Sequence, residues 1–278
     1  QTLVGIWPME GQDETLLERL QAYALKAARE GKQETSWLNP NETYEAGIRG
    51  FISGLLDPER SQEFLQSLDA TARRLALLGA LNSLSQITLK ATISGVPDFY
   101  QGTELWDFSM VDPDNRRPVD FGARAAALHK VESPDWRHLA KDWTTGHVKL
   151  AWTRHLLKLR NELSTVFTTG GYESLDVSGR HRDHIIAFAR RRGAEAAIVV
   201  VGRVFAPFTD GGRTWLQPDT FDAAVHVNGY TIEHVSSAPE LQVSSLFTHL
   251  PATVLKARVK NTTRRIQRRI QVPAETLG

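Results

Sequence analysis

The 278-residue sequence contains no cysteine. This excludes a disulfide framework and a thiolate-bound metal, and it fits a reducing compartment, so we expect a cytoplasmic protein. No apolar run approaches the roughly 20 residues that are needed to cross a bilayer, so the sequence predicts no membrane partner. An excess of either charge is also missing, because 33 basic and 32 acidic residues leave a formal charge of +1. This balance gives no overall field to attract nucleic acid.

Several motifs of cofactor and metal sites are missing as well. There is no Walker loop and no glycine-rich dinucleotide fingerprint. The acidic turn that begins at Asp112 lacks the glycine and the distal glutamate of a calcium loop. His181 and His184 are close in sequence, but a turn before a strand explains them more simply than a metal site does. We therefore expect no metal and no organic cofactor.

Apolar residues at helical spacing dominate the first half of the chain. The spacing predicts helices over residues 14–30, 42–56, 67–90 and 148–163. Asp13 and Asn41 are candidates to cap the first two helices, and Pro58 ends the second. The sequence opens at Gln1 in an apolar stretch, with no initiator methionine and no signal-like segment, which indicates a piece of a longer protein.

Beyond Gly170 the apolar pattern changes to period two. Runs of β-branched residues, separated by glycine-containing turns, predict antiparallel strands near residues 185–189, 196–201, 223–227 and 252–257. The change predicts two domains, a helical region over residues 1–170 and a β-rich domain over residues 171–278. The basic stretch at residues 264–271 fits neither domain, and a solvated tail explains it more simply than a site for polyanions.

The most specific sequence begins at Gly95, ends at Asp120 and reads GVPDFYQGTELWDFSMVDPDNRRPVD. Its front part resembles the GxPxxYxGxE segment of the α-amylase superfamily, which forms the last barrel strand and the loop after it. Its back part, DPDNRRPVD, resembles one branch of that superfamily, the maltooligosyltrehalose synthases. The TSWLNPNE sequence at residues 35–42 and the opening QTLVG agree with that branch. The resemblance covers about residues 1–205.

This resemblance implies a fold class of α/β plus all-β. We expect the C-terminal part of a (β/α)8 barrel with associated helices, followed by an antiparallel β-sandwich domain. In such barrels the functional residues lie on loops at the C-terminal ends of the strands, and the loop from Gln101 onward would occupy that place. Gly95 and Gly102 would turn the backbone at the two ends of a short strand.

The loop offers side chains of the kinds that bind a sugar. A pyranose has an apolar face that packs on aromatic rings, and its hydroxyls bond to carboxylates, amides and guanidinium groups. By resemblance, Asp112 and Arg116 lie beside the glucose unit that accepts the new bond, which charge-assisted hydrogen bonds would hold. An ordinary solvated turn is the alternative for the DPDN sequence. The candidate substrate-binding residues of the loop are Tyr100, Gln101, Glu104, Trp106, Asp112, Asn115, Arg116 and Arg117.

A second candidate segment is the short turn between the first two predicted helices. Here the resemblance implies that Trp37 and Asn39 contribute to the reducing-end sugar sites. The alternative is structural, with Trp37 packed against the protein and Asn41 capping the second helix.

The residues that break the glycosidic bond are expected outside this chain. Retaining glycosidases need two carboxyl groups about 5 Å apart. In the α-amylase superfamily these groups precede the GVPDFYQG segment, and a third lies in a His-Asp motif that does not occur before Gly95. The resemblance therefore implies no catalytic residue in this chain, which alone is expected to be inactive. Its expected partners are the N-terminal catalytic part of the same polypeptide and a maltooligosaccharide.

The resemblance also implies a reaction for the intact enzyme. It would be a (1→4)-α-D-glucan 1-α-D-glucosylmutase, which isomerises the reducing-end α-1,4 linkage of a maltooligosaccharide to α,α-1,1 in trehalose biosynthesis. Two alternatives stay open. The chain could belong to another glycosidase or transglucosidase of the α-amylase superfamily, or it could be a non-catalytic carbohydrate-binding module.

Overall fold

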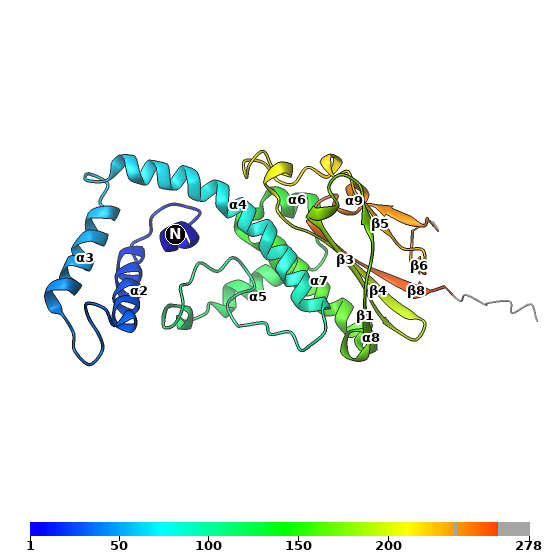
Figure 1. Cartoon of the computed structure of the whole chain (residues 1–278), viewed down its shortest axis with the longest axis horizontal. Helices are drawn as coiled ribbons and strands as arrows, with labels where there is room; N and C mark the ends of the chain where they lie inside the picture. The colour runs from blue at the N-terminus through cyan, green and yellow to red at the C-terminus, as the bar shows by residue number, and fades with distance from the viewer. Residues whose placement is uncertain (236–237, 261–278) are drawn as a thin grey trace, which may run out of the picture.

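Helices α2 and α3 lie at one end of the protein, the strands lie at the other with α7 and α8 beside them, and the long helix α4 joins the two ends (Figure 1). This arrangement comes from a computed structural model, which describes residues 1–235 and 238–260. The α-helices are α1 (Thr2–Ile6), α2 (Leu16–Gly31), α3 (Glu42–Leu56), α4 (Gln62–Thr92), α5 (Phe121–Lys130), α6 (Trp136–Lys141), α7 (His147–Glu162), α8 (Ser164–Thr169) and α9 (Val243–Leu246).

The four helices predicted from apolar spacing are confirmed as α2, α3, α4 and α7. Helix α4 begins earlier than predicted, at Gln62, because Leu65 and Leu68 already pack into the core formed with α1, α2 and α3. Asn41 caps α3, and its side chain accepts a hydrogen bond from the Tyr44 amide at 3.1 Å. Asp13 does not cap α2, since the N-cap is Thr15.

Helix α4 is the spine of the protein. Its 31 residues extend about 46 Å at 1.5 Å per residue. Along this length it contributes to three apolar cores in turn. Ala72 packs with α1 and α2, Leu81 packs into the core formed by the two sheets, and Leu84 packs with α7 and α8. One helix thus fixes the helical end relative to the sheets.

The segment after α4 was predicted to be a short strand, and this is wrong for the described structure. Residues 96–100 form no regular structure. Gly95 and Gly102 do take positive φ values, of 120° and 90°, so the backbone turns where glycine was predicted to allow it. A strand also needs a paired neighbour, and all the strands of the described residues begin at Gly171 or later.

Two antiparallel sheets follow, as the period-two pattern predicted. One sheet has five strands in the order β1-β3-β4-β8-β6, and the other has three in the order β2-β5-β7. The strands are β1 (Gly171–Ser174), β2 (Val177–Ser178), β3 (Ile185–Arg192), β4 (Glu195–Gly202), β5 (Ala224–His226), β6 (Tyr230–Ile232), β7 (Glu240–Gln242) and β8 (Ala252–Val259).

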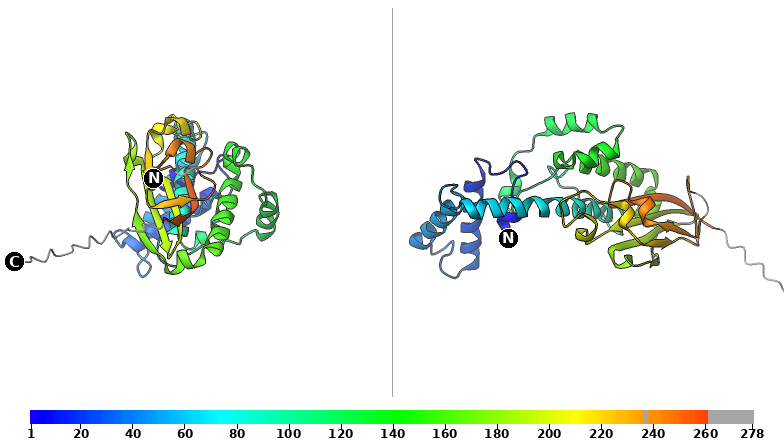
Figure 2. Two further views of the ribbon diagram at one scale, coloured as in Figure 1. Left: turned by 90° about the vertical axis from the view of Figure 1, so that its right-hand side faces the viewer. Right: turned by 90° about the horizontal axis from the view of Figure 1, so that it is seen from above.

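Strand β4 lies at the centre of the larger sheet and is buried on both faces. Ile198 and Val200 face the core shared with the smaller sheet, whereas Val199 and Val201 face α4, α7 and α8. Both sets are fully buried, which explains why this strand is a continuous apolar run rather than an alternating one. Figure 2 shows the helical layer with α5, α6 and α7 on one side of the strands.

The structure and the sequence predictions agree at the level of helices followed by antiparallel sheets. The division into two domains, and the barrel and sandwich, stay predictions. The basic stretch at residues 264–271 lies outside the described residues. Within the described part of the chain, no helix combines the length and the apolar character that a membrane crossing requires.

Candidate functional site

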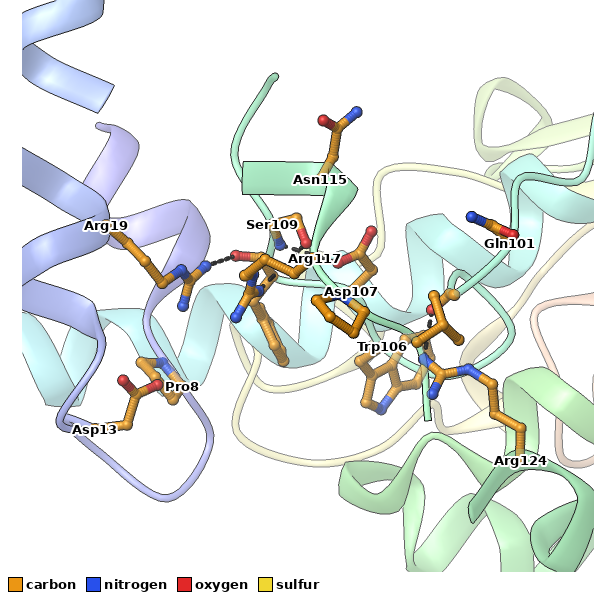
Figure 3. A pocket seen from close by; sticks show the side chains of 14 residues that line it. Pro8, Asp13, Arg19, Gln101, Trp106, Asp107, Ser109, Asn115, Arg117 and Arg124 are labelled. Carbon is orange, nitrogen blue, oxygen red and sulfur yellow. Dashed lines mark hydrogen bonds between the residues drawn. The ribbon is translucent and has the colours of Figure 1, made fainter. Parts of the chain in front are cut away.

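The predicted loop passes between α2 and α5 and borders a hollow of about 330 Å³ (Figure 3). Four of the ten predicted binding residues line it together, namely Gln101, Trp106, Asn115 and Arg117. The other lining residues are Pro8, Asp13, Arg19, Gly102, Asp107, Phe108, Ser109, Pro118, Val119 and Arg124. The hollow therefore combines two aromatic residues, Trp106 and Phe108, with several guanidinium and amide donors.

Two arginines of this hollow were not predicted from the sequence. Arg19 of α2 binds both carboxylate oxygens of Asp114, from Nε to Oδ1 and from Nη2 to Oδ2, each at 2.9 Å. Arg124 of α5 binds Glu104 from Nε to Oε2 at 2.8 Å. The partners of each pair lie far apart in sequence, so no local motif marks them.

Asp112 and Arg116 form a pair at the outside of the loop. Arg116 Nε lies 2.5 Å from Asp112 Oδ1, and the Arg116 side chain is 71% exposed. The contact lacks hydrogen-bond geometry, so Asp112 Oδ1 accepts no hydrogen bond within the part of the chain that the structure describes. These two residues do not line the hollow. They contact each other, and the Arg116 side chain is open to solvent.

Glu104 and Tyr100 have local partners. Glu104 is bound to Arg124, and its Oε1 also accepts a hydrogen bond from the Gly102 amide at 3.3 Å. The Tyr100 carbonyl accepts hydrogen bonds from the Thr103 hydroxyl and amide, while its ring is 45% exposed. The Glu104 carboxylate therefore shapes the loop, whereas the Tyr100 ring is open for contact.

Trp106 is held in place by two neighbours. Its Nε1 donates to the Trp143 carbonyl at 2.7 Å, and Lys149 Nζ lies 5.7 Å from its ring centroid. Lys149 is buried and donates to the Leu105 carbonyl at 2.9 Å. Burial lowers the pKa of Lys149 to about 8, which the nearby Asp107 charge only partly offsets. The aromatic wall of the hollow is thus fixed from behind by a buried amine.

The Lys149 amine should make stability depend on pH. Its pKa is about 8 in the folded protein against 10.5 for the free group. Between these values the unfolded chain binds more protons, so the free energy of unfolding rises with pH in this window. Two and a half pKa units correspond to at most roughly 3.4 kcal/mol. Denaturation of the wild type and of Lys149→Met at pH 7.5, 9 and 10 measures it. We expect only the wild type to gain stability relative to the variant, and parallel curves would contradict the lowered pKa.

The predicted turn at residues 35–41 lies beyond the C-terminal end of α2. Trp37 is 57% exposed and lies under the Arg29 guanidinium, whose Cζ is 4.8 Å from the ring centroid. The Asn39 backbone closes the turn through hydrogen bonds with Ser36. Trp37 is therefore not a core residue, and one face of its ring is covered by a cation.

The two histidines considered for a metal site contact an aromatic ring, and one of them also accepts a backbone hydrogen bond. His181 and His184 both make edge contacts with the Phe208 ring, and His181 Nδ1 accepts a hydrogen bond from the Asp222 amide. Across residues 1–235 and 238–260, no three side chains of the metal-binding types come together.

No protein-family model matches the chain. Among curated proteins, one from Mycobacterium tuberculosis named as a maltooligosyl trehalose synthase is 37% identical over 201 residues, which cover 72% of this chain and 24% of that protein. Among solved structures, a variant of the maltooligosyltrehalose synthase from Arthrobacter ramosus is similar with a TM-score of 0.71 and 31% identity, over 93% of this chain and 31% of that one. A Sulfolobus tokodaii protein described as a maltooligosyl trehalose synthase gives a TM-score of 0.62 and 26% identity, over the same shares.

Proposed function

Because the chain is homologous to a segment of the maltooligosyltrehalose synthases, we propose that it forms the acceptor side of such an enzyme. In this role it binds the glucose unit that receives the new bond. The chain spans about a quarter of the length of the curated relative it matches. The names of its relatives describe whole proteins, so the reaction of the intact enzyme is also part of what we propose.

The observation that carries the proposal is the composition of the hollow. Trp106 supplies an aromatic wall, and Gln101, Asn115 and Arg117 supply donors around it. A sugar ring needs both, because it has an apolar face and a rim of hydroxyls. The hollow, at about 330 Å³, is at the lower end of the sizes usual for small-molecule pockets.

The reaction needs a closed acceptor site. A carboxylate elsewhere in the enzyme displaces the terminal glucose and forms a glycosyl-enzyme bond, while an acid protonates the departing O4. The glucose then turns, and its C1 hydroxyl attacks the glycosyl carbon as the carboxylate leaves and a base takes the proton. Water is neither consumed nor released. The released glucose must therefore stay bound and oriented until it attacks, before water does.

We assign the cleaving carboxylates to a part of the polypeptide outside this chain. The two acids that line the hollow are both used in local turns. Asp13 accepts hydrogen bonds from the Thr15 hydroxyl and amide, which lower its pKa against the effect of burial. Asp107 accepts from the Ser109 amide. A general acid needs a raised pKa, whereas the pKa of Asp13 is lowered, so Asp13 is not suited to that role.

Exposed apolar side chains on α3, on α4 and after α4 support a partner for this chain. Phe51, Leu75 and Val96 are 71%, 46% and 98% exposed. Isolated exposed apolar residues are ordinary, but bulky ones on α3, α4 and the segment after it fit a surface that another part of the enzyme covers. The activity test therefore uses both this chain and a full-length synthase that carries it.

The test is product analysis with maltopentaose. The full-length synthase carrying this segment should convert it to a trehalose-ended product without new reducing ends, and this chain alone should give no product. Hydrolysis or branching instead would favour another enzyme of the α-amylase superfamily. Sugar binding by this chain, with no trehalose-ended product from the full-length protein, would favour a carbohydrate-binding module. Product from the chain alone would contradict our placement of the carboxylates.

A further inference from the structure

We propose that one face of helix α2 aligns the two segments of the candidate site and that Arg19 is the positioning residue for the loop at residues 107–117. This inference rests on the proposed function. The face consists of Arg19, Lys26 and Arg29, which we call the α2 cation row. Each member contacts a segment that carries predicted sugar-binding residues.

The spacing of the α2 cation row follows helix geometry. Lys26 is seven residues after Arg19, and Arg29 is three residues after Lys26, so the side chains are about two turns and then one turn apart on one side of α2. The row thus runs along the helix from the 107–117 loop towards the turn at residues 35–41. These two segments are separated by about 70 residues of sequence, and α2 is the element that contacts both.

Arg19 makes three hydrogen bonds to the loop at residues 107–117. Besides its two hydrogen bonds to Asp114, its Nη2 donates to the Phe108 carbonyl at 2.8 Å. The side chains of Arg19 and Asp114 are only 11% and 10% exposed. A two-point guanidinium–carboxylate contact fixes orientation as well as distance. Arg19 therefore fixes two points of the loop, at residues 108 and 114.

Asp114 transmits this anchor to the rest of the loop. Its Oδ2 also accepts a hydrogen bond from the Met110 amide at 2.7 Å. Arg117 Nε lies 3.1 Å from Asp114 Oδ1, and Arg117 lines the hollow. The Asp114 carboxylate therefore joins Met110, which precedes Asp112, to Arg117, which follows Arg116, and it holds the backbone between them.

The other members of the row contact the predicted residues more directly. Lys26 Nζ donates to the Asp112 carbonyl and lies 4.0 Å from Asp112 Oδ2. Arg29 binds both carboxylate oxygens of the buried Glu45 and covers the Trp37 ring. Glu45 in turn accepts from the Thr35 hydroxyl at 2.7 Å. One helix face thus sets the places of Asp112 and Trp37.

The experiment uses a full-length synthase carrying this segment. The variants are Arg19→Lys, Asp114→Asn and the two combined, with Arg137→Lys on the exposed surface of α6 as the matched control. The measurements are KM, kcat for bond cleavage, and the ratio of free glucose to trehalose-ended product. Lysine keeps the charge of Arg19 but cannot make the two-point contact. We expect the ratio to rise about tenfold or more in each single variant, as one lost charged hydrogen bond implies, while cleavage changes by less than about twofold.

The combined variant separates positioning from a loss of folding. Arg19 and Asp114 act through one contact, so the ratio in the double variant should equal that of a single variant rather than the product of the two effects. Lys26→Met gives a second route, because it frees the Asp112 carbonyl without touching the buried pair. Its ratio should also rise.

The outcomes distinguish this inference from the proposed function. If the unmodified synthase makes trehalose-ended product and the ratio is unchanged in Arg19→Lys, Asp114→Asn and Lys26→Met, the positioning role is overturned. A fall in cleavage that the control does not show, with no change in the ratio, also overturns it. If the unmodified synthase makes no trehalose-ended product, the proposed function itself fails.

Discussion

Arg116→Lys and Asp112→Ala, in a full-length synthase carrying this segment, should release more free glucose for each trehalose-ended product. The two side chains contact each other on the outside of the loop and not in the hollow, and the family resemblance implies that they lie beside the released glucose. Each charge-assisted hydrogen bond contributes roughly 1.5–3 kcal/mol, so losing one should weaken retention about tenfold or more. Lysine keeps the charge of Arg116 but loses the planar fork. The ratio of glucose to trehalose-ended product on maltopentaose measures the effect.

A matched control for this pair lies just before strand β3. Arg182 and Asp183 also form an exposed contact, with Nε and Oδ1 3.9 Å apart. Arg182→Lys and Asp183→Ala should leave the product ratio unchanged. If Arg116→Lys and Asp112→Ala lower all turnover evenly and leave the ratio at the control value, the DPDN sequence serves only as a turn.

Arg190→Ala should lower the free energy of unfolding by about 3 kcal/mol or more. The Arg190 side chain is almost fully buried and donates only to backbone carbonyls within the described residues. These are Thr92 at 2.7 Å, Gly170 at 2.8 Å, Gly171 at 3.3 Å and Phe167 at 3.4 Å. They include the C-terminal end of α4 and the residues that end α8, where a cation is favourable. Alanine would leave these buried acceptors without partners.

Chemical denaturation of the chain measures this effect, with Arg192→Ala as the control. Arg192 is exposed at the end of the same strand, so its loss should change stability by less than about 0.5 kcal/mol. If Arg190→Ala does not fold, Arg190→Lys gives a measurable intermediate loss, since one ammonium group cannot reach all four carbonyls. A loss for Arg190→Lys no larger than the control would show that these hydrogen bonds contribute little.

Local pattern was enough to predict most of the secondary structure. The period of the apolar residues predicted α2, α3 and α7 to within about two residues, because each helix buries one stripe. The continuous apolar run at residues 196–201 predicted β4, and glycine was expected at both positions where the backbone turns around residues 95–102. The sequence resemblance also pointed to the family, and the comparisons agree with it. These features depend on neighbours in the chain.

The contents of the candidate site were only partly predictable. Gln101, Trp106, Asn115 and Arg117 were singled out from one loop and lie around one hollow. Arg19 and Arg124 were missed, because their partners are 95 and 20 residues away. An arginine beside an apolar stripe gives the same sequence pattern whether it faces solvent or a buried carboxylate.

The tertiary structure alone decided which charges are buried and which segments meet. Arg190 follows the strand predicted at residues 185–189, with nothing in the sequence to distinguish it from Arg191 or Arg192. Only the tertiary structure brings it to the carbonyls at the ends of α4 and α8 and at the start of β1. Likewise, the segment at residues 96–100 has strand-like composition but no described strand beside it. Periodicity within one element records which face is buried. Pairing between elements is decided by packing, because the partner of a long-range hydrogen bond cannot be identified from the residues next to it in the sequence.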